Sequence, residues 1–483
     1  MENNKSYLLS KEASNSSRKQ RSVSILQYGN DEKSHYNRRL TEHQQQAAAA
    51  SFRRTNARKK LSVLLGFSTG NSEKKFESVN SDTIPEMSLS KHVIAGYFVS
   101  WGIYAREHNV AKVDATKLSH ILYAFANVRE DGTVFLGDPW ADIEKHYEGD
   151  SWNEEGTNLY GSFKQLGLLK RQNRHVKVSL SIGGWTWSSN FAGVAASHET
   201  RRRFVDSSIE LLNDLGLDGL DVDWEYPKDK NEAKNFVQLL EELRHALDKC
   251  AESKNETTRY LLTAAVPCGK EKYKVMRLDE MNEYLDLFYL MAYDFEGAWS
   301  SHANHQTHLY GGDVSTDRAV RYYLKQGIPS HKIILGVPMY GRAFQNTKGL
   351  GHRFEGVGEG TWEQGIYDYK QLPRPGALEH FDEKSVASYS YDDCSRELVT
   401  YDTPKSLHHK CKYIQEKKLG GTMFWELSAD HPTDHERSLL SVVYHGLGGA
   451  QCLDDTPNHL SYPDMMNLFG LVFDAYMVTV SQK

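Results

Sequence analysis

Long hydrophobic runs, paired cysteine motifs and a large excess of one charge are all missing from this 483-residue chain. No run approaches the ~20 apolar residues of a membrane span, so we expect no transmembrane segment. The five cysteines form no CxxC pair, which argues against a zinc or redox site but leaves one or two disulfides open. The formal net charge of -6 argues against general nucleic-acid binding.

Both ends of the chain differ in composition from its middle. Residues 1–90 are rich in Ser, Asn, Gln, Lys and Arg, and such a segment buries too little apolar surface to fold, so we predict a disordered basic tail. Its first residues, Met1 to Lys19, lack the hydrophobic segment of a secretory signal. We therefore expect intracellular or unconventional delivery, with secretion or cell-wall association as the alternative. Residues 451–483 form a second tail without an assignable role.

Residues 218–225, with the sequence DGLDVDWE, alternate acidic and apolar side chains. This alternation predicts a β-strand that presents Asp221, Asp223 and Glu225 on one face. Carboxylates two residues apart on a strand lie roughly 6–7 Å from each other, and such neighbours resist ionising together. Tyr226-Pro227 ends the strand, because proline cannot donate to a ladder. We therefore predict an acid–base site at the tip of a buried strand rather than a solvated acidic loop.

From about residue 92, strand-like apolar runs alternate with amphipathic, helix-like segments. Eight repeats of this alternation favour a parallel (β/α)8 barrel over residues 91–450, in which catalytic residues lie at the C-terminal ends of the strands. A doubly wound sheet is the alternative, but no GxGxxG follows the first run. The eight runs are Val93–Val99, His120–Val128, Val176–Ile182, Leu217–Tyr226, Tyr260–Val266, Leu285–Asp294, Lys332–Tyr340 and Gly421–Leu427. The clearest helices are Arg201–Leu215, Glu232–Cys250, Thr316–Gln326 and Thr403–Lys417.

The seventh and eighth runs are about eighty residues apart, which is too far for one connecting helix. The intervening residues 345–398 are rich in Gly, Tyr and charged side chains. We predict a small α+β insertion here that forms one wall of the cleft.

Six motifs, in barrel order, resemble those of glycoside hydrolase family 18, and within it the fungal and bacterial-type endochitinases, including the yeast sporulation type. The resemblance covers most of residues 92–445, and the insertion resembles the extra domain of some members through Gly360–Glu363 and Tyr367–Tyr369. The motifs are Gly96–Phe98, Ser179–Trp185, Asp218–Pro227, Met291–Asp294, Gly336–Arg342 and Gly421–Glu426.

The resemblance implies a reaction in which the N-acetyl carbonyl oxygen of the sugar attacks its own anomeric carbon. Glu225 would then act as acid and afterwards as base. Asp223 would bind the acetamide N–H and share a proton with Asp221. The Tyr293 hydroxyl would bind the acetamide carbonyl, and Asp294 would support the acid and the sugar. Crowding among the acids should raise the apparent pKa of Glu225.

The resemblance also implies which side chains bind the sugar chain. Trp425 would form the floor under the cleaved sugar, and the other expected substrate-binding residues are Tyr97, Trp185, Tyr226, Met291, Trp299 and Arg342. Histidines 305, 308, 408 and 409 have no spacing that matches a ligand set, so we expect neither a metal nor a cofactor. The expected partner is chitin or a chitooligosaccharide, bound by a monomer.

Three functions remain open from the sequence. The first is an endo-acting chitinase that hydrolyses β-1,4 linkages between N-acetylglucosamine units with retention of configuration. The second is a non-catalytic chitin-binding lectin, although such relatives typically lose the acid that corresponds to Glu225. The third is an endo-β-N-acetylglucosaminidase acting on N-glycans.

Overall fold

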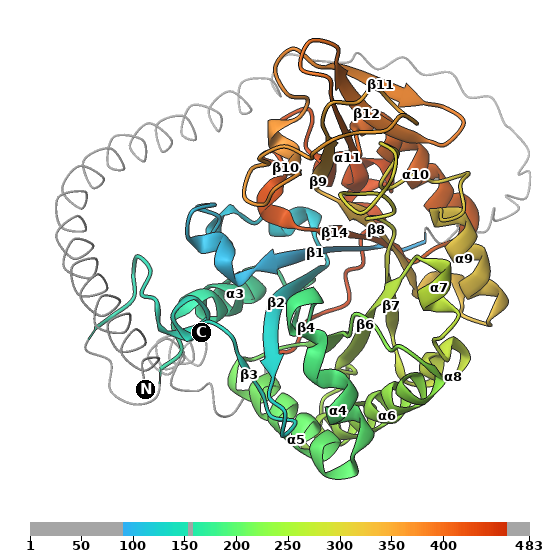
Figure 1. Cartoon of the computed structure of the whole chain (residues 1–483). Helices are drawn as coiled ribbons and strands as arrows, with labels where there is room; N and C mark the ends of the chain where they lie inside the picture. The colour runs from blue at the N-terminus through green and yellow to red at the C-terminus, as the bar shows by residue number, and fades with distance from the viewer. Residues whose placement is uncertain (1–89, 153–157, 461–483) are drawn as a thin grey trace, which may run out of the picture. The chain divides into compact units, whose positions relative to one another are not determined.

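A computed structural model of the chain describes residues 90–152 and 158–460 (Figure 1). The predicted N-terminal tail, apart from its last residue, and residues 461–483 of the C-terminal tail lie outside this part. Disorder in the N-terminal tail therefore stays a prediction.

Eight parallel strands close into a barrel in the order β1-β14-β8-β7-β6-β5-β4-β2, and pairing of β1 with β2 completes the ring (Figure 1). The predicted (β/α)8 fold is confirmed. A short strand, β3 (Val134–Leu136), adds antiparallel to β2. The barrel strands are β1 (Val93–Val99), β2 (His120–Val128), β4 (Lys177–Gly183), β5 (Gly219–Asp223), β6 (Leu261–Pro267), β7 (Leu287–Met291), β8 (Ile333–Pro338) and β14 (Gly421–Trp425).

The predicted strand runs extend beyond the observed ends of β5, β7, β8 and β14, the last of which ends at Trp425 and not at Leu427. Strand β5 ends at Asp223, so Glu225 lies just beyond the strand and not on it. The alternation of faces nevertheless continues, because Trp224 is buried and stacks on Phe191 at 5.5 Å between ring centroids. Strand β7 likewise ends before Tyr293, and β8 ends at Pro338. Sequence periodicity shows which face a side chain occupies, and this alternation can continue after the ladder hydrogen bonds end. The predicted strand ends therefore lie beyond the observed ones.

The helices cover the outside of the barrel (Figure 1). In the longest, α6, apolar residues spaced three or four apart form the buried face, among them Phe236, Leu240, Leu243 and Leu247. Asp229 begins this helix by accepting hydrogen bonds from the N–H groups of the second and third residues after it. The described helices are α3 (Gly161–Gln172), α4 (Phe191–Ala196), α5 (His198–Asp214), α6 (Lys230–Ser253), α7 (Lys270–Tyr273), α8 (Leu278–Tyr284), α9 (Thr316–Lys325), α10 (Pro404–Lys417) and α11 (Leu439–Gly446).

The insertion is a five-stranded antiparallel sheet in the order β10-β9-β13-β12-β11, drawn in orange in Figure 1. It contains a 3-10 turn (Tyr369–Gln371) but no α-helix, so the predicted helical part is wrong in detail. The many glycines of this segment with positive φ, such as Gly356 and Gly358, favour turns over helix. Its strands are β9 (Tyr340–Phe344), β10 (Ile366–Asp368), β11 (Leu378–Asp382), β12 (Ala387–Asp392) and β13 (Glu397–Tyr401).

The described part of the C-terminal tail packs against the N-terminal end of the barrel. Leu453 bridges to His92, and the His459 N–H donates to Asp218 Oδ1 at 2.7 Å. Asp218 Oδ2 accepts from the Val178 N–H at 2.7 Å, and this carboxylate pairs with buried Lys170. Asp218 therefore organises the start of β5 and lies away from its catalytic end.

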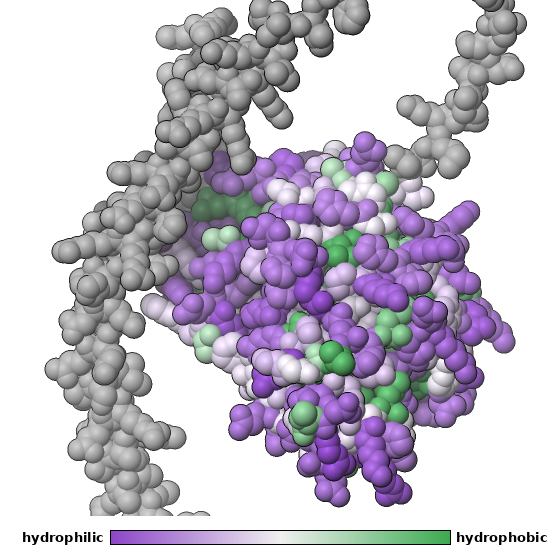
Figure 2. Space-filling model, turned by 90° about the horizontal axis from the view of Figure 1, so that it is seen from above, coloured by the Kyte–Doolittle hydropathy of each residue, from purple (hydrophilic) through white to green (hydrophobic). Residues whose placement is uncertain are grey.

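The face seen in Figure 2 is predominantly hydrophilic, with hydrophobic residues in small separate groups. None of the described helices has the length and apolar character needed to cross a bilayer. All five cysteines lie in the described part of the chain and are free.

Candidate active site

A cleft of about 1010 Å³ lies at the C-terminal ends of the barrel strands and extends to the insertion. It brings together all of the predicted site residues except Asp221, although they come from the six separate motifs and, for Trp299, from outside them. Those on the cleft wall are Tyr97, Trp185, Asp223, Glu225, Tyr226, Met291, Tyr293, Asp294, Trp299, Arg342 and Trp425.

Asp221 lies beneath the cleft and is fully buried. Its carboxylate accepts hydrogen bonds from the hydroxyls of Ser181 and Thr263, each at 2.7 Å, and of Tyr97 at 3.0 Å. Burial raises the pKa of Asp221, while these three hydroxyl donors oppose the rise. This acid is therefore placed to act on its neighbour Asp223 and not on a ligand directly.

Asp223 is the last residue of β5 and is 4% exposed. Its Oδ1 has no hydrogen-bond partner among the described residues. Burial raises the pKa of Asp223 well above its usual value, and the charges of Glu225 and Asp221 add to the rise. Gly183 allows this packing, because a Cβ at that position would lie 2.3 Å from the Asp223 carbonyl oxygen. A buried acceptor that faces the cleft is suited to an N–H donor of a ligand.

Glu225 lies two residues beyond Asp223, and its backbone N–H donates to the Ser188 hydroxyl at 2.8 Å. Burial raises the pKa of Glu225 to about 7; a hydrogen bond from Tyr226 opposes the rise, and the Asp294 charge adds to it. A carboxyl group that keeps its proton near neutral pH can serve as a general acid.

Tyr293 and Asp294 follow the end of β7, and both line the cleft. Asp294 has a φ of 59°, in the left-handed region that few residues other than glycine occupy. Its Oδ1 accepts from the Tyr340 hydroxyl at 2.5 Å and from Arg342 Nε at 2.6 Å. The ion pair with Arg342 and the hydrogen bond from Tyr340 hold the Asp294 carboxylate, so this acid is not a free nucleophile.

Aromatic rings form the floor and rim of the cleft. Trp425 meets Tyr97 edge to face at 5.1 Å between ring centroids and stacks on Phe125 at 5.6 Å. Trp185 and Trp299 are 77% and 63% exposed, and the guanidinium of Arg342 lies over the Trp299 ring. Exposed indole faces pack well against the C–H faces of sugar rings.

Several residues that line the cleft were not predicted from the sequence. Tyr340, Trp362 and Asp368 lie inside motifs that were recognised, so their positions were visible even though no role was assigned to them. The others lie outside the recognised motifs, and no local pattern marks them. Among the missed residues are Trp101, Arg106, Phe125, Trp187, Tyr340, Trp362 and Asp368.

None of the four histidines lines the cleft that holds Asp223 and Glu225. His305 and His308 are buried next to each other, with His305 3.3 Å from Asp382, while His408 and His409 are exposed on α10. Across residues 90–152 and 158–460, no three His, Cys, Asp or Glu side chains cluster in a way that suits a metal ion.

The sequence profile of the glycosyl hydrolases family 18 matches residues 93–430, which is more than half of the chain. The chain belongs to this family. Chitinase 1 of Aphanocladium album is 45% identical over 393 residues, covering 80% of this chain and 92% of that protein. Endochitinase 1 of Metarhizium robertsii is 45% identical over 390 residues, covering 79% and 91% of the two chains. The catalytic domain of chitinase B from Arthrobacter TAD20 shares the fold with a TM-score of 0.69 and 30% identity, covering 77% and 98%.

Membership of family 18 makes this chain a glycosidase, as the motifs predicted. The family is one of the recognised exceptions to the use of two carboxylates as acid and nucleophile. The three acids of the family motif lie at the end of β5, where Asp221 is enclosed and Asp223 and Glu225 reach the cleft.

Proposed function

We propose that the chain is an endo-acting chitinase that hydrolyses β-1,4 linkages between N-acetylglucosamine units with retention of configuration. The attacking group is the acetamide oxygen of the bound sugar, and Glu225 is the acid and then the base. The observation that carries this proposal is the contrast between the two acids at the cleft: Asp223 offers an unpaired buried oxygen, and the pKa of Glu225 is raised to about 7.

The other predicted catalytic carboxylates do not offer a protein nucleophile. Asp221 is enclosed by three hydroxyl donors, and Asp294 is held by Tyr340 and Arg342. Asp223 is confined beside two other acids, and burial disfavours its charged form. An acetamide oxygen supplied by the substrate can act as the nucleophile instead. Asp223 then needs only to orient the acetamide N–H, and the positive charge that develops beside it favours its ionised form, which stabilises that charge.

The proposed reaction has two steps. In the first, the acetamide oxygen forms a bond to the anomeric carbon while Glu225 gives its proton to the departing glycosidic oxygen. The sugar is then a cyclic oxazolinium ion next to Asp223, with the Tyr293 hydroxyl near its former carbonyl oxygen. In the second, Glu225 takes a proton from a water that attacks the anomeric carbon, and the ring opens to restore the acetamide. Two displacements at one carbon give net retention.

The choice of chitin as substrate is supported by the relatives, which bear the names chitinase and endochitinase. The cleft suits a linear sugar chain, because the exposed indoles of Trp185, Trp299 and Trp362 supplement the floor formed by Trp425. Retention of Glu225 argues against a non-catalytic lectin.

The test is hydrolysis of chromogenic chitobioside and chitotrioside by the purified chain, with the anomer of the first product followed by NMR. We expect turnover with a β-anomer, and near loss of turnover in Glu225→Gln. Binding of chitooligosaccharides without turnover would favour the lectin. Release of N-glycans from a glycoprotein, without cleavage of chitin oligomers, would favour the endo-β-N-acetylglucosaminidase. Full activity of Glu225→Gln would refute the assigned acid.

A further inference from the structure

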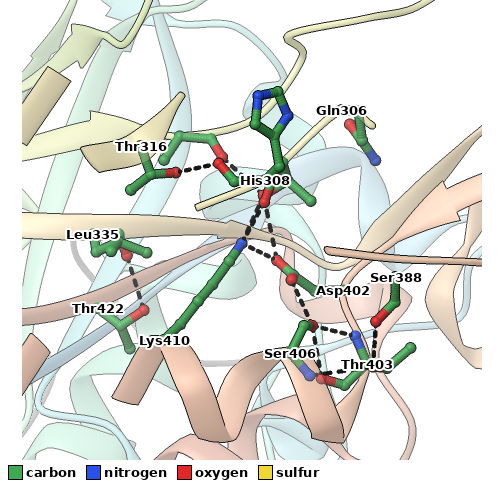
Figure 3. Close-up of polar contacts among 12 residues, drawn as sticks. Gln306, His308, Thr316, Leu335, Ser388, Asp402, Thr403, Ser406, Lys410 and Thr422 are labelled. Atoms are coloured by element: carbon green, nitrogen blue, oxygen red, sulfur yellow. Dashed lines mark hydrogen bonds and ion pairs between the residues drawn. The ribbon is translucent and has the colours of Figure 1, made fainter. Parts of the chain in front are cut away.

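A buried ammonium group lies behind the cleft, outside the set of residues that line it. Lys410 of α10 is 1% exposed, and its Nζ lies 2.7 Å from Oδ2 of Asp402, which is 0% exposed (Figure 3). The same Nζ donates to the Thr307 carbonyl at 2.7 Å and to the Thr307 hydroxyl at 2.8 Å. All three protons of the ammonium therefore have acceptors. Burying such a pair costs several kcal/mol in desolvation, so stability alone is a weak reason for its presence.

The Thr307 hydroxyl links the buried ammonium to the backbone beside the cleft. It accepts from Lys410 and has one proton to donate, for which the Ala292 carbonyl at 2.8 Å is a closer acceptor than Asp402 Oδ2 at 3.3 Å. Ala292 lies beyond the last ladder residue of β7 and directly precedes Tyr293 and Asp294. The backbone before these two site residues is therefore held by a group outside the barrel strands.

The neighbouring residue, Gln306, holds the backbone on the other side. Its carbonyl accepts from the Phe295 N–H at 3.0 Å, directly after Asp294. Its side-chain Nε2 donates to the Tyr340 carbonyl at 3.0 Å, and the Tyr340 hydroxyl in turn donates to Asp294 Oδ1. Hydrogen bonds from Thr307 to Ala292 and from Phe295 to Gln306 thus hold the segment 292–295 at both ends.

The backbone conformation of Asp294 explains why the segment 292–295 needs these hydrogen bonds. A non-glycine residue with φ of 59° costs free energy and persists only where the surrounding contacts enforce it. Asp402 directly follows β13 of the insertion, and its Oδ1 accepts from the Ser406 hydroxyl at 2.7 Å at the start of α10 (Figure 3). One ion pair therefore connects the β7 loop, the end of β13 and α10.

We propose that the Lys410–Asp402 pair is a positioning device that, through Thr307 and Gln306, fixes Tyr293 and Asp294 in the geometry required by the transition state. The inference rests on the proposed function, since it assigns Tyr293 to the acetamide and Asp294 to the sugar. Positioning that acts in the transition state lowers kcat when it is lost and leaves KM nearly unchanged.

The decisive variant is Thr307→Val, which keeps the shape of the side chain and removes the hydroxyl. We expect kcat on the chromogenic chitotrioside to fall about tenfold, with KM changed by less than about twofold. Affinity for a thiazoline analogue of the cyclised sugar should fall by the same factor, because such an analogue resembles the reacting state. Thr307→Ser keeps the hydroxyl and should restore kcat to within about twofold.

Thr422→Val is the matched control. Its hydroxyl is equally buried and donates to a strand carbonyl, that of Leu335, at 2.8 Å (Figure 3), but neither residue lies on the cleft wall. It should lower the melting temperature by less than Thr307→Val, which also removes an acceptor of the buried ammonium, and it should leave kcat unchanged. Equal kcat in Thr307→Val and Thr422→Val, with an active wild type, would overturn the inference.

Lys410→Met addresses the ion pair itself, with folding checked by circular dichroism. We expect the folded variant to share the kcat defect of Thr307→Val, and a folded variant with normal kcat would overturn the role of the pair. If Lys410→Met does not fold, the comparison of Thr307→Val with Thr307→Ser and Thr422→Val tests the inference. An inactive wild type would instead refute the proposed function, so the two failures are distinguishable.

Discussion

Replacing Glu225 with glutamine should stabilise the folded protein above neutral pH while removing the proposed activity. Burial raises the pKa of Glu225 from 4.5 to about 7 in the folded chain. A group with a raised folded-state pKa contributes stability that is fully present below the unfolded pKa and is lost as pH rises through the folded pKa. Glutamine resembles the protonated acid at every pH and does not undergo this loss.

The size of the effect follows from the shift. At about 1.4 kcal/mol per pKa unit, a rise from 4.5 to about 7 corresponds to at most about 3.5 kcal/mol at pH 8. Asp223 shares the interaction, because the charge of Glu225 raises the pKa of Asp223 as well. We therefore expect a gain in the free energy of unfolding of about 1 to 3 kcal/mol at pH 8 and close to zero at about pH 4.

The assay is urea unfolding of wild type and Glu225→Gln across this pH range, followed by tryptophan fluorescence. Glu363→Gln is the matched control, because Glu363 lies on the same cleft wall but is exposed. Its stability should differ from wild type by the same small amount at every pH. Curves for wild type and Glu225→Gln that stay parallel from acid to alkaline pH would show that Glu225 is not desolvated, and the argument for its role as acid would fail.

Three further predictions concern turnover. The value of kcat/KM should fall as pH rises through about 7, where Glu225 loses its proton, and a profile that stays level to about pH 9 would contradict this. Asp223→Asn should lower kcat by roughly 10²- to 10³-fold, since a neutral amide cannot stabilise the oxazolinium charge, and an unchanged rate would count against substrate assistance. Trp425→Ala should raise KM for chitotriosides about 3- to 10-fold through lost ring packing; a normal KM would mean that the indole does not form the floor.

Local patterns carried much of the prediction. Alternation over residues 218–225 places Asp221, Asp223 and Glu225 on one side of β5, because successive side chains of an extended segment point to opposite faces. Eight such runs separated by amphipathic segments were enough to indicate the barrel, since parallel strands require helical crossovers. The family motifs contain most of the residues that line the cleft.

Tertiary structure alone decided how those residues differ. The sequence presents Asp221 and Asp223 as equivalents, yet only Asp221 is enclosed by hydroxyls from three other strands, while Asp223 keeps an unpaired oxygen. The pairing of Asp294 with Arg342, and the connection of Lys410 to the β7 loop, likewise join residues that are tens to more than a hundred positions apart. Burial and charge act through space and not along the chain, so the protonation and anchoring of each acid depend on contacts that no local pattern records.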